Sequence, residues 1–99
     1  MDLDNLIHER SRLRIITYLA GRENGRASFN ELQDSLGFTS GNLSVQLKKL
    51  NEAAYVSIDK SFRENKPYTT IKLTAAGRKA MNRYIQEMET IIQTIKNQQ

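Results

Sequence analysis

The chain has 99 residues and a formal net charge of +4, which suits one small core and is too short for two independent ones. It contains no cysteine and a single histidine, His8, so disulfides and thiolate zinc sites are excluded. No stretch of about 18 apolar residues occurs, and the first residues lack the apolar centre of a signal peptide. We therefore expect a cytoplasmic protein with no membrane segment.

The positive charge is concentrated in the middle of the chain. Residues 40–72 contain six basic and three acidic residues, whereas residues 1–39 contain five basic and six acidic ones. Because phosphate backbones attract clustered cations, the middle region is the first candidate for contact with nucleic acid. The excess is modest, so the position of these residues must decide what they do.

The first predicted helix covers SRLRIITYLAG, residues 11–21. Ser11 is its candidate N-cap and Gly21 its end. Its apolar residues fall on two sides, which predicts two packing neighbours. The polar segment that follows contains Asn24-Gly25, a typical turn signal.

A second and a third helix follow in close succession. Ser28 precedes Glu31 by three residues, the spacing of a capping box in which each side chain satisfies a backbone N–H at the helix start. Gly37 ends this helix, and Thr39 is the N-cap of the next. The third helix has a buried stripe of leucines at Leu43, Leu47 and Leu50.

Downstream, the apolar residues alternate with a period of two. Val56 and Ile58 predict one strand and TTIKL, residues 69–73, a second, so both can turn one apolar face toward the helices. The segment ASF, residues 27–29, could add a short third strand. The connection KSFRENKPY, residues 60–68, is too long for a two-residue turn and predicts a projecting hairpin with Lys60, Arg63 and Lys66.

The last predicted helix begins after Thr74, its N-cap, and carries an apolar residue every three or four positions for roughly four turns. The core of so small a domain cannot bury the whole stripe. We expect its distal part to meet a partner, which the family resemblance described below implies is a second copy of the chain. The alternative is that this helix folds back on its own N-terminal helix, and the two arrangements are compatible. The residues predicted at the dimer interface are Leu3, Leu6, Ile7, Met81, Tyr84, Ile85, Met88, Ile91, Ile92 and Ile95.

Helix, short helix, tight connection, third helix and β-hairpin is the order of a winged helix-turn-helix domain. The stretch GNLSVQLKKLNEAAYV, residues 41–56, followed by a basic hairpin and LTAAGRKAM, residues 73–81, resembles the small MarR/ArsR-like winged-helix transcription regulators. The resemblance covers about residues 3–90. It implies an α+β, mainly α fold: a three-helix core plus a β-hairpin wing, with a long C-terminal dimerisation helix. We expect one winged-helix domain over residues 1–99, with the core and wing in 1–73 and the dimerisation helix in 74–97.

Two positions depart from the family pattern. Ala54 stands where the family usually has glycine, just after the third helix, which is the DNA-recognition helix of this family. If this residue must be left-handed, alanine costs roughly 1 kcal/mol, and the turn could be reshaped. Gln46 stands where relatives often place histidine, which changes any base contact expected at that position.

The third helix has an outer face that suits a DNA major groove. With residues at about 100° intervals and the leucines inward, Gly41, Val45 and Lys48 point away from the core. Gly41 lets a DNA backbone approach the helix N-terminus, and Val45 can contact a thymine methyl group. The alternative is a solvated face with one incidental exposed valine. The predicted DNA contacts are Thr39, Ser40, Gly41, Asn42, Ser44, Val45, Gln46, Lys48, Lys49, Lys60, Arg63 and Lys66.

Two aromatic residues lie near the hairpin tip. Phe62 and Tyr68 are expected to pack at the base of the wing rather than to stack on nucleic acid. Arg63 and Lys66 at the tip can reach phosphates or a narrow minor groove. The alternative for these charges is that they only prevent edge-to-edge strand pairing.

No recognisable catalytic arrangement occurs. His8 stands beside Glu9 without a further partner, the serines lack a partner base, and there is no glycine-rich phosphate loop. We expect no enzymatic activity, no metal and no cofactor.

The leading hypothesis is a homodimeric, sequence-specific regulator of transcription that binds double-stranded DNA and represses by occlusion at an inverted repeat. Two alternatives stay open: a winged-helix module for protein interaction, and an architectural or replication-type DNA binder with little sequence preference. We expect no separate ligand domain. Any small-molecule effector is therefore expected at the dimer interface, or between that interface and the DNA-binding elements.

Overall fold

A computed structural model describes residues 3–98; Met1, Asp2 and Gln99, which the predicted domain span includes, lie outside it. Over the described residues the fold is mainly helical, with a three-stranded antiparallel sheet, and the predicted winged helix class is confirmed. The element order is α1 (Arg10–Ala20), the short 3₁₀ helix η1 (Glu23–Gly25), β1 (Arg26–Ser28), α2 (Phe29–Leu36), α3 (Ser40–Glu52), β2 (Val56–Arg63), β3 (Lys66–Leu73) and α4 (Ala75–Asn97).

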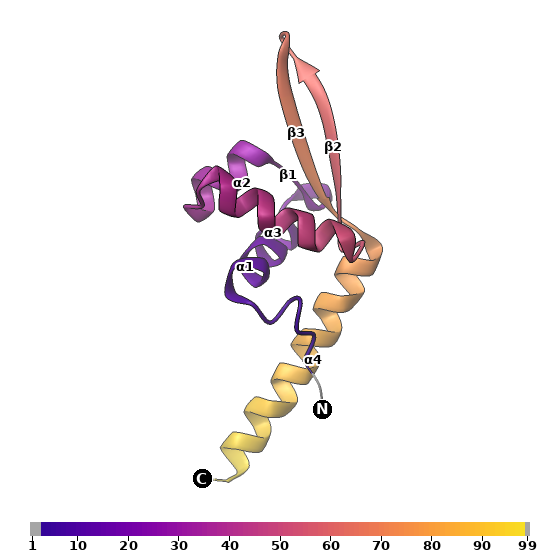
Figure 1. Ribbon diagram of the computed structural model, residues 1–99. Coiled ribbons are helices and arrows are strands. Elements are labelled where there is room, and N and C mark those ends of the chain that lie inside the picture. Colours follow the sequence, from indigo (N-terminus) through magenta and orange to yellow (C-terminus); the bar gives the residue numbers. More distant parts are fainter. Residues whose placement is uncertain (1–2, 99) are drawn as a thin grey trace.

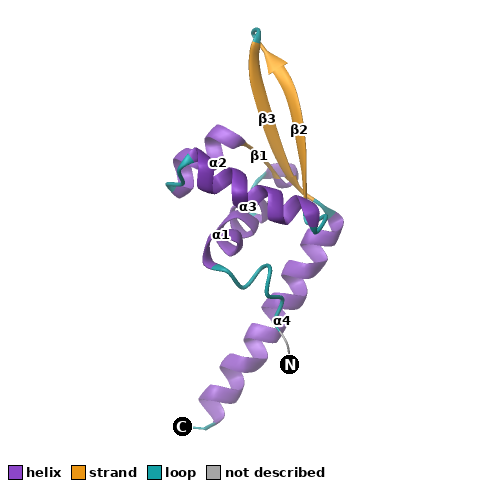
Figure 2. Ribbon diagram, in the orientation of Figure 1, coloured by secondary structure: helices purple, strands orange, loops and turns teal. Residues whose placement is uncertain are grey.

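The molecule is elongated, 58 × 25 × 23 Å along its principal axes. The helices α1, α2 and α3 form a central body, and the β2–β3 hairpin leaves it in one direction (Figure 1). The helix α4 leaves in roughly the opposite direction, so that much of its length extends beyond the body (Figure 2). Among residues 3–98, no helix is both long and apolar enough to cross a bilayer.

Side chains cap the N-termini of three helices as predicted. The hydroxyls of Ser28, Thr39 and Thr74 accept hydrogen bonds from backbone N–H groups three residues further along, at 3.0, 3.1 and 3.0 Å. The capping box at Ser28 is only half formed, because the Glu31 carboxylate does not reach back. It accepts the hydroxyl of Tyr18 at 2.6 Å and pairs with Arg22 at 3.0 Å.

The predicted N-cap of the first helix was wrong. Ser11 lies inside α1, and Glu9 caps it by accepting a hydrogen bond from the backbone N–H of Arg12 at 3.0 Å. A glutamate side chain is long enough to reach this N–H, which a rule based on serine, threonine and aspartate overlooks. The bond to the Arg12 N–H stabilises the carboxylate and lowers the pKa of Glu9.

The sheet has the strand order β1-β3-β2, and the short third strand predicted before the second helix is present. The hairpin differs from its prediction, because β2 and β3 remain paired as far as Arg63 and Lys66. Only Glu64 and Asn65 form the turn, with φ angles of 53° and 63°. Two positive φ angles match the twist of the flanking strands, and this is why a two-residue turn closes the long hairpin.

The main core lies where α1, α2, α3 and the base of the sheet meet. The predicted leucine stripe of α3 is fully used, with Leu43, Leu47 and Leu50 between 0% and 3% exposed. The other buried members are Ile15, Ile16, Leu19, Ala27, Leu32, Val56, Ile71 and Leu73. The Val56 and Ile71 side chains anchor only the base of the hairpin, so its outer half projects into solvent.

Ala54 adopts the left-handed conformation that the family pattern assigns to glycine, with φ of 63°. The turn after α3 is therefore not reshaped by the alanine. The backbone N–H groups of Ala54 and Tyr55 donate to the carbonyls of Asn51 and Leu50 at 2.9 and 3.0 Å. The hydroxyl of Thr74 donates to the Ala54 carbonyl at 2.6 Å. These bonds hold a strained backbone in place.

Candidate nucleic-acid interface

The outward face of α3 presents an apolar residue and a glycine to solvent. Val45 is 49% exposed, although valine is usually buried. Gly41, one turn earlier, is exposed, and a Cβ added there would meet no atom within 4 Å. The fold therefore does not require glycine at this position. Any requirement for glycine here would come from outside the chain, such as the close approach of another backbone.

The amide of Gln46 points toward α1 rather than outward. Its Oε1 accepts from Nη1 of Arg12 at 2.8 Å, and its Nε2 donates to Oδ1 of Asn42 at 3.2 Å. Arg12 also donates from Nε to the Leu6 carbonyl at 2.6 Å. Arg12 thus joins the N-terminal segment, α1 and α3. Sequence reasoning missed this residue, because its partner is 34 positions away and no local pattern marks it.

The two faces of the wing carry different chemistry. Register places Ile58, Lys60 and Phe62 on the face that continues from the core, because side chains alternate along β2. Arg63 lies on the other face, where its guanidinium sits 4.0 Å from the centre of the Tyr68 ring. Such a contact holds the long arginine side chain in one orientation.

Phe62 does not pack at the base of the wing, and that prediction was wrong. Its side chain is 75% exposed near the hairpin tip, opposite Pro67. The strands remain paired to Arg63, which carries Phe62 well beyond the core. The sequence signal was available, since Phe62 continues the alternation that begins at Val56.

The predicted dimer residues divide into two groups. Ile7 is 0% exposed and Tyr84 6% exposed, and with Ala80 they form a small cluster that fastens α4 to the N-terminal segment. Leu3 and Met88 are packed against this cluster, and Leu6 and Met81 against the main core. The structure thus gives Ile7 and Tyr84 a role within the chain.

The second group lies along the distal part of α4 and is exposed. Ile85, Ile92 and Ile95 are 43%, 42% and 51% exposed, and Ile91 is half-buried.

Within residues 3–98, no group of three or more histidine, cysteine, aspartate or glutamate side chains is placed to hold a metal ion. His8 contacts the hydroxyl of Tyr84 through Nδ1 at 2.8 Å. That contact joins the N-terminal segment to α4 and belongs to the packing of the fold.

Comparison with known proteins decides the family. The sequence profile of the winged helix DNA-binding domain matches residues 11–92, which include α2, α3, the wing and all of α1 except its first residue. The chain belongs to this winged helix family. This winged helix protein is 41% identical over 86 residues to an uncharacterised protein of Methanocaldococcus jannaschii, covering 87% of the chain and 88% of the relative.

Solved structures share the fold of this winged helix protein. A transcriptional regulator homologue from Pyrococcus horikoshii superposes with a TM-score of 0.85 at 24% identity, covering 93% of this chain and 89% of the other. A MarR family transcriptional regulator from Streptomyces coelicolor, solved in complex with DNA, gives a TM-score of 0.75 at 16% identity. That match covers 98% of this chain and 64% of the other. The predicted resemblance to MarR-like regulators is confirmed for the fold, which this chain shares with both structures.

Proposed function

We propose that the protein is a homodimeric repressor that recognises an inverted-repeat operator in double-stranded DNA. The single observation that carries this proposal is the outward face of α3, where Gly41 and Val45 are exposed without a structural reason. A water-facing helix surface is served better by alanine, lysine or glutamate. A DNA major groove gives both residues a use.

In this proposal, the contacts of α3 have distinct roles. Val45 meets a thymine methyl group, while Asn42 and Ser44 bond base edges or phosphate. Thr39 and Ser40 at the helix start present backbone N–H groups to a phosphate. The side chains of Gln46, Lys48, Lys49, Lys60, Arg63 and Lys66 complete the proposed set, with the cations along the DNA backbone. Because Arg12 holds the Gln46 side chain, we expect Gln46 mainly to position α3. Its own contact with DNA would lie at the edge of the protein–DNA interface.

The dimer is supported by the distal part of α4. Three isoleucines there are exposed on a helix that extends beyond the body of the protein (Figure 1). Packing this stripe against the same stripe of a second copy would bury it and place two copies of α3 on one face of the dimer. In this arrangement residues 1–73 read DNA and residues 74–97 pair the protomers. Half-sites about one helical turn apart would follow.

The winged-helix relative solved with DNA supports the assignment of DNA as the partner. Repression follows from geometry in the simplest case, since a bound dimer excludes the transcription machinery from the same DNA. A small-molecule effector fits this proposal as the signal that releases the dimer.

The test is selection of bound fragments from the source genome at near-physiological salt, followed by sequencing. The proposal expects enrichment of an inverted repeat with half-sites about one turn apart. Salt-sensitive binding without an enriched sequence would contradict it in favour of an architectural binder. Complete failure to bind DNA would instead indicate a protein-interaction module.

A further inference from the structure

Three side chains form a hydrogen-bonded relay from α1 to the start of the recognition helix α3. Nη1 of Arg12 donates to Oε1 of Gln46 at 2.8 Å, and Nε2 of Gln46 donates to Oδ1 of Asn42 at 3.2 Å. Gln46 and Asn42 are four residues apart on α3, the spacing at which helical side chains meet. The relay therefore begins at a partly buried residue, Arg12, and ends at an exposed one, Asn42.

The first member of the relay is held in one orientation. The Arg12 side chain is 11% exposed, and the Glu9 carboxylate lies 3.8 Å from its Nη1. Its Nε donates to the Leu6 carbonyl at 2.6 Å. Because the N–H groups of a guanidinium are fixed in one plane, the bond to Leu6 also sets the direction of Nη1. The relay therefore starts from a fixed donor.

The chemistry of arginine determines which way both amides point. A guanidinium has N–H donors and no acceptor, so Gln46 must turn its oxygen toward Arg12. The Gln46 nitrogen then faces Asn42, which must turn its own oxygen toward Gln46. Within residues 3–98, the bond to Gln46 is the only one that the Asn42 side chain makes. Asn42 is thus left with its Nδ2 group, which carries two N–H donors, directed away from Gln46.

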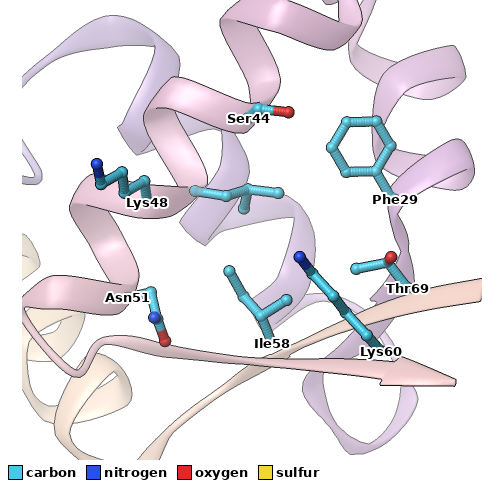
Figure 3. Close-up of a pocket in the computed structure, with 8 residues that line it drawn as sticks. Phe29, Ser44, Lys48, Asn51, Ile58, Lys60 and Thr69 are labelled. Carbon is cyan, nitrogen blue, oxygen red and sulfur yellow. The ribbon is translucent and has the colours of Figure 1, made fainter.

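The relay lies on the side of α3 that is turned away from the wing. Ser44 and Lys48 line a cavity of about 430 Å³ between α3 and the wing, on the side of the helix that faces β2 (Figure 3). At about 100° per residue, Asn42 and Gln46 each lie about 160° around the helix from Ser44. The orientation of Asn42 is therefore set from α1, through Arg12, and not from the wing.

The direction of the Asn42 amide selects the base that it can read. Guanine presents two acceptors, N7 and O6, in the major groove, whereas cytosine presents a donor. An asparagine that is free to turn pairs with adenine instead, because it offers one acceptor and one donor. In the relay, the acceptor of Asn42 is already used within the protein. Its two remaining donors match guanine best.

We propose that Arg12 and Gln46 are positioning residues that fix Asn42 as a hydrogen-bond donor, and that Asn42 reads a guanine in each half-site. The second half rests on the proposed function, because it requires α3 to lie in a major groove. Asn42 is three residues before Val45, so both side chains face the same groove. The proposal narrows the contact of Asn42 from a base edge or a phosphate to one base.

The relay itself is tested on the full chain without DNA. Side-chain amide resonances are followed by NMR in the wild type and in Arg12→Met, which keeps the apolar stem and removes the guanidinium. The resonances of Gln46 and Asn42 should shift, while those of Asn51, on the wing side of α3, should stay in place. Gln46→Met gives a second variant that leaves the packing of Arg12 in α1 intact. An Asn42 resonance that neither variant moves would overturn the relay.

Gln46→Glu gives a result that a merely structural role would not give. The new carboxylate still accepts from Arg12, but it has no N–H group, so Asn42 turns its nitrogen toward it and presents its oxygen outward. The preferred base should then change from guanine to adenine or cytosine, which present a donor in the major groove. The added negative charge weakens binding to all DNA. The preference is therefore measured as the ratio of affinities for the four bases at each position.

Single-base variants of the selected operator fragment measure these ratios. The wild type should prefer guanine by about fivefold or more at one position of each half-site, and Asn42→Ala should lose this preference alone. Ser44→Ala, on the wing side of α3, is the matched control and should keep it. An equal loss at every position in Asn42→Ala would make Asn42 a phosphate contact and overturn the guanine assignment.

The remaining outcomes separate the relay from the proposed function. A guanine preference that is unchanged in Gln46→Glu would overturn control of Asn42 by the relay, although the protein still binds its operator. If the wild type binds no DNA while Arg12→Met still shifts the Asn42 resonance, the proposed function and the guanine contact fail and the relay stands.

Discussion

Gly77, in the first turn of α4, lies directly against the carbonyl oxygen of Tyr55 in the turn that follows α3. The same carbonyl accepts a hydrogen bond from the backbone N–H of Thr74 at 3.1 Å. The start of α4 is therefore fixed to the turn that follows α3 through backbone contacts. In a dimer, this junction would set the distance between the two copies of α3.

Replacing Gly77 by alanine should destabilise the fold. The new Cβ would overlap the Tyr55 carbonyl and come within 2.8 Å of Cδ1 of Leu73, and backbone cannot move aside as a flexible side chain can. We expect a loss of about 1–3 kcal/mol in the free energy of unfolding, measured by urea denaturation. Gly41→Ala is the matched control in α3, where the added methyl meets open space. It should raise stability by up to about 1 kcal/mol. A neutral Gly77→Ala would contradict the close contact.

Replacing Ala54 by glycine should stabilise the protein. Ala54 has φ of 63°, a conformation that costs an alanine roughly 1 kcal/mol and a glycine little. Denaturant unfolding should show a gain of about that size. Ala53→Gly is the control, because Ala53 has an ordinary φ of −83° and glycine only adds freedom to the unfolded chain. If both variants lose stability, the left-handed turn carries no strain.

Replacing Val45 by serine should change sequence preference without changing the fold. Val45 is 49% exposed, so serine removes no core contact. Loss of a thymine-methyl contact should cost about 1 kcal/mol or more, at one or two base positions only. Binding to a set of single-base operator variants measures this. A uniform loss over all positions, or none, would rule out the methyl contact.

Replacing Ile92 and Ile95 by glutamate should yield monomers. Both side chains are about half exposed, so the charges disturb little within the chain but would be buried in the proposed dimer. Light scattering should report half the mass of the wild type. Thr90→Glu with Thr94→Glu is the control, since these exposed residues lie on the other side of α4. Persistent dimers in the isoleucine variant would place the interface elsewhere.

Replacing Tyr55 by phenylalanine should loosen the N-terminal segment. The hydroxyl of Tyr55 donates to Oδ2 of Asp4 at 2.6 Å, and this bond, helped by partial burial, raises the pKa of Tyr55 above its ordinary value of 10.0. A raised pKa contributes stability that is present below pH 10 and is lost as pH rises through the folded-state pKa. We expect a loss of about 1 kcal/mol at pH 7 and a weaker alkaline decline than in wild type. Chemical denaturation at pH 7, 9 and 11 measures both. Parallel curves for the two proteins would show that the bond contributes nothing.

Several features of the fold could be predicted because they depend on neighbours in the sequence. The caps at Ser28, Thr39 and Thr74 are satisfied by N–H groups three residues away, so short spacings reveal them. The leucine stripe of α3 shows which side of that helix is buried, and so which side faces outward. The outward face with Gly41 and Val45 follows from this alone.

The candidate site depended more on tertiary structure. The sequence does not reveal that Gln46 is held by Arg12, or that a cavity forms where Phe29, Ser44 and Lys60 meet, because these residues come from separate elements. The glutamate cap of α1 and the half-formed capping box at Glu31 were missed as well. Glu9 caps α1 although glutamate is not a usual N-cap residue, and Glu31 bonds Tyr18 and Arg22 instead of its own helix start.

The sequence by itself determined the order of the elements, the caps of α2, α3 and α4 and the buried side of α3, since these arise from the helical period and from bonds over three or four residues. Tertiary structure decided which apolar residues are buried within the chain and which remain exposed. Ile7 and Tyr84 are 77 positions apart and bury each other, while Ile92 and Ile95 remain exposed on the same helix. In the sequence, Tyr84, Ile92 and Ile95 look alike, because all three belong to the apolar stripe of α4. Only the path of the chain in space brings one stripe residue against a neighbour and leaves the next one in water.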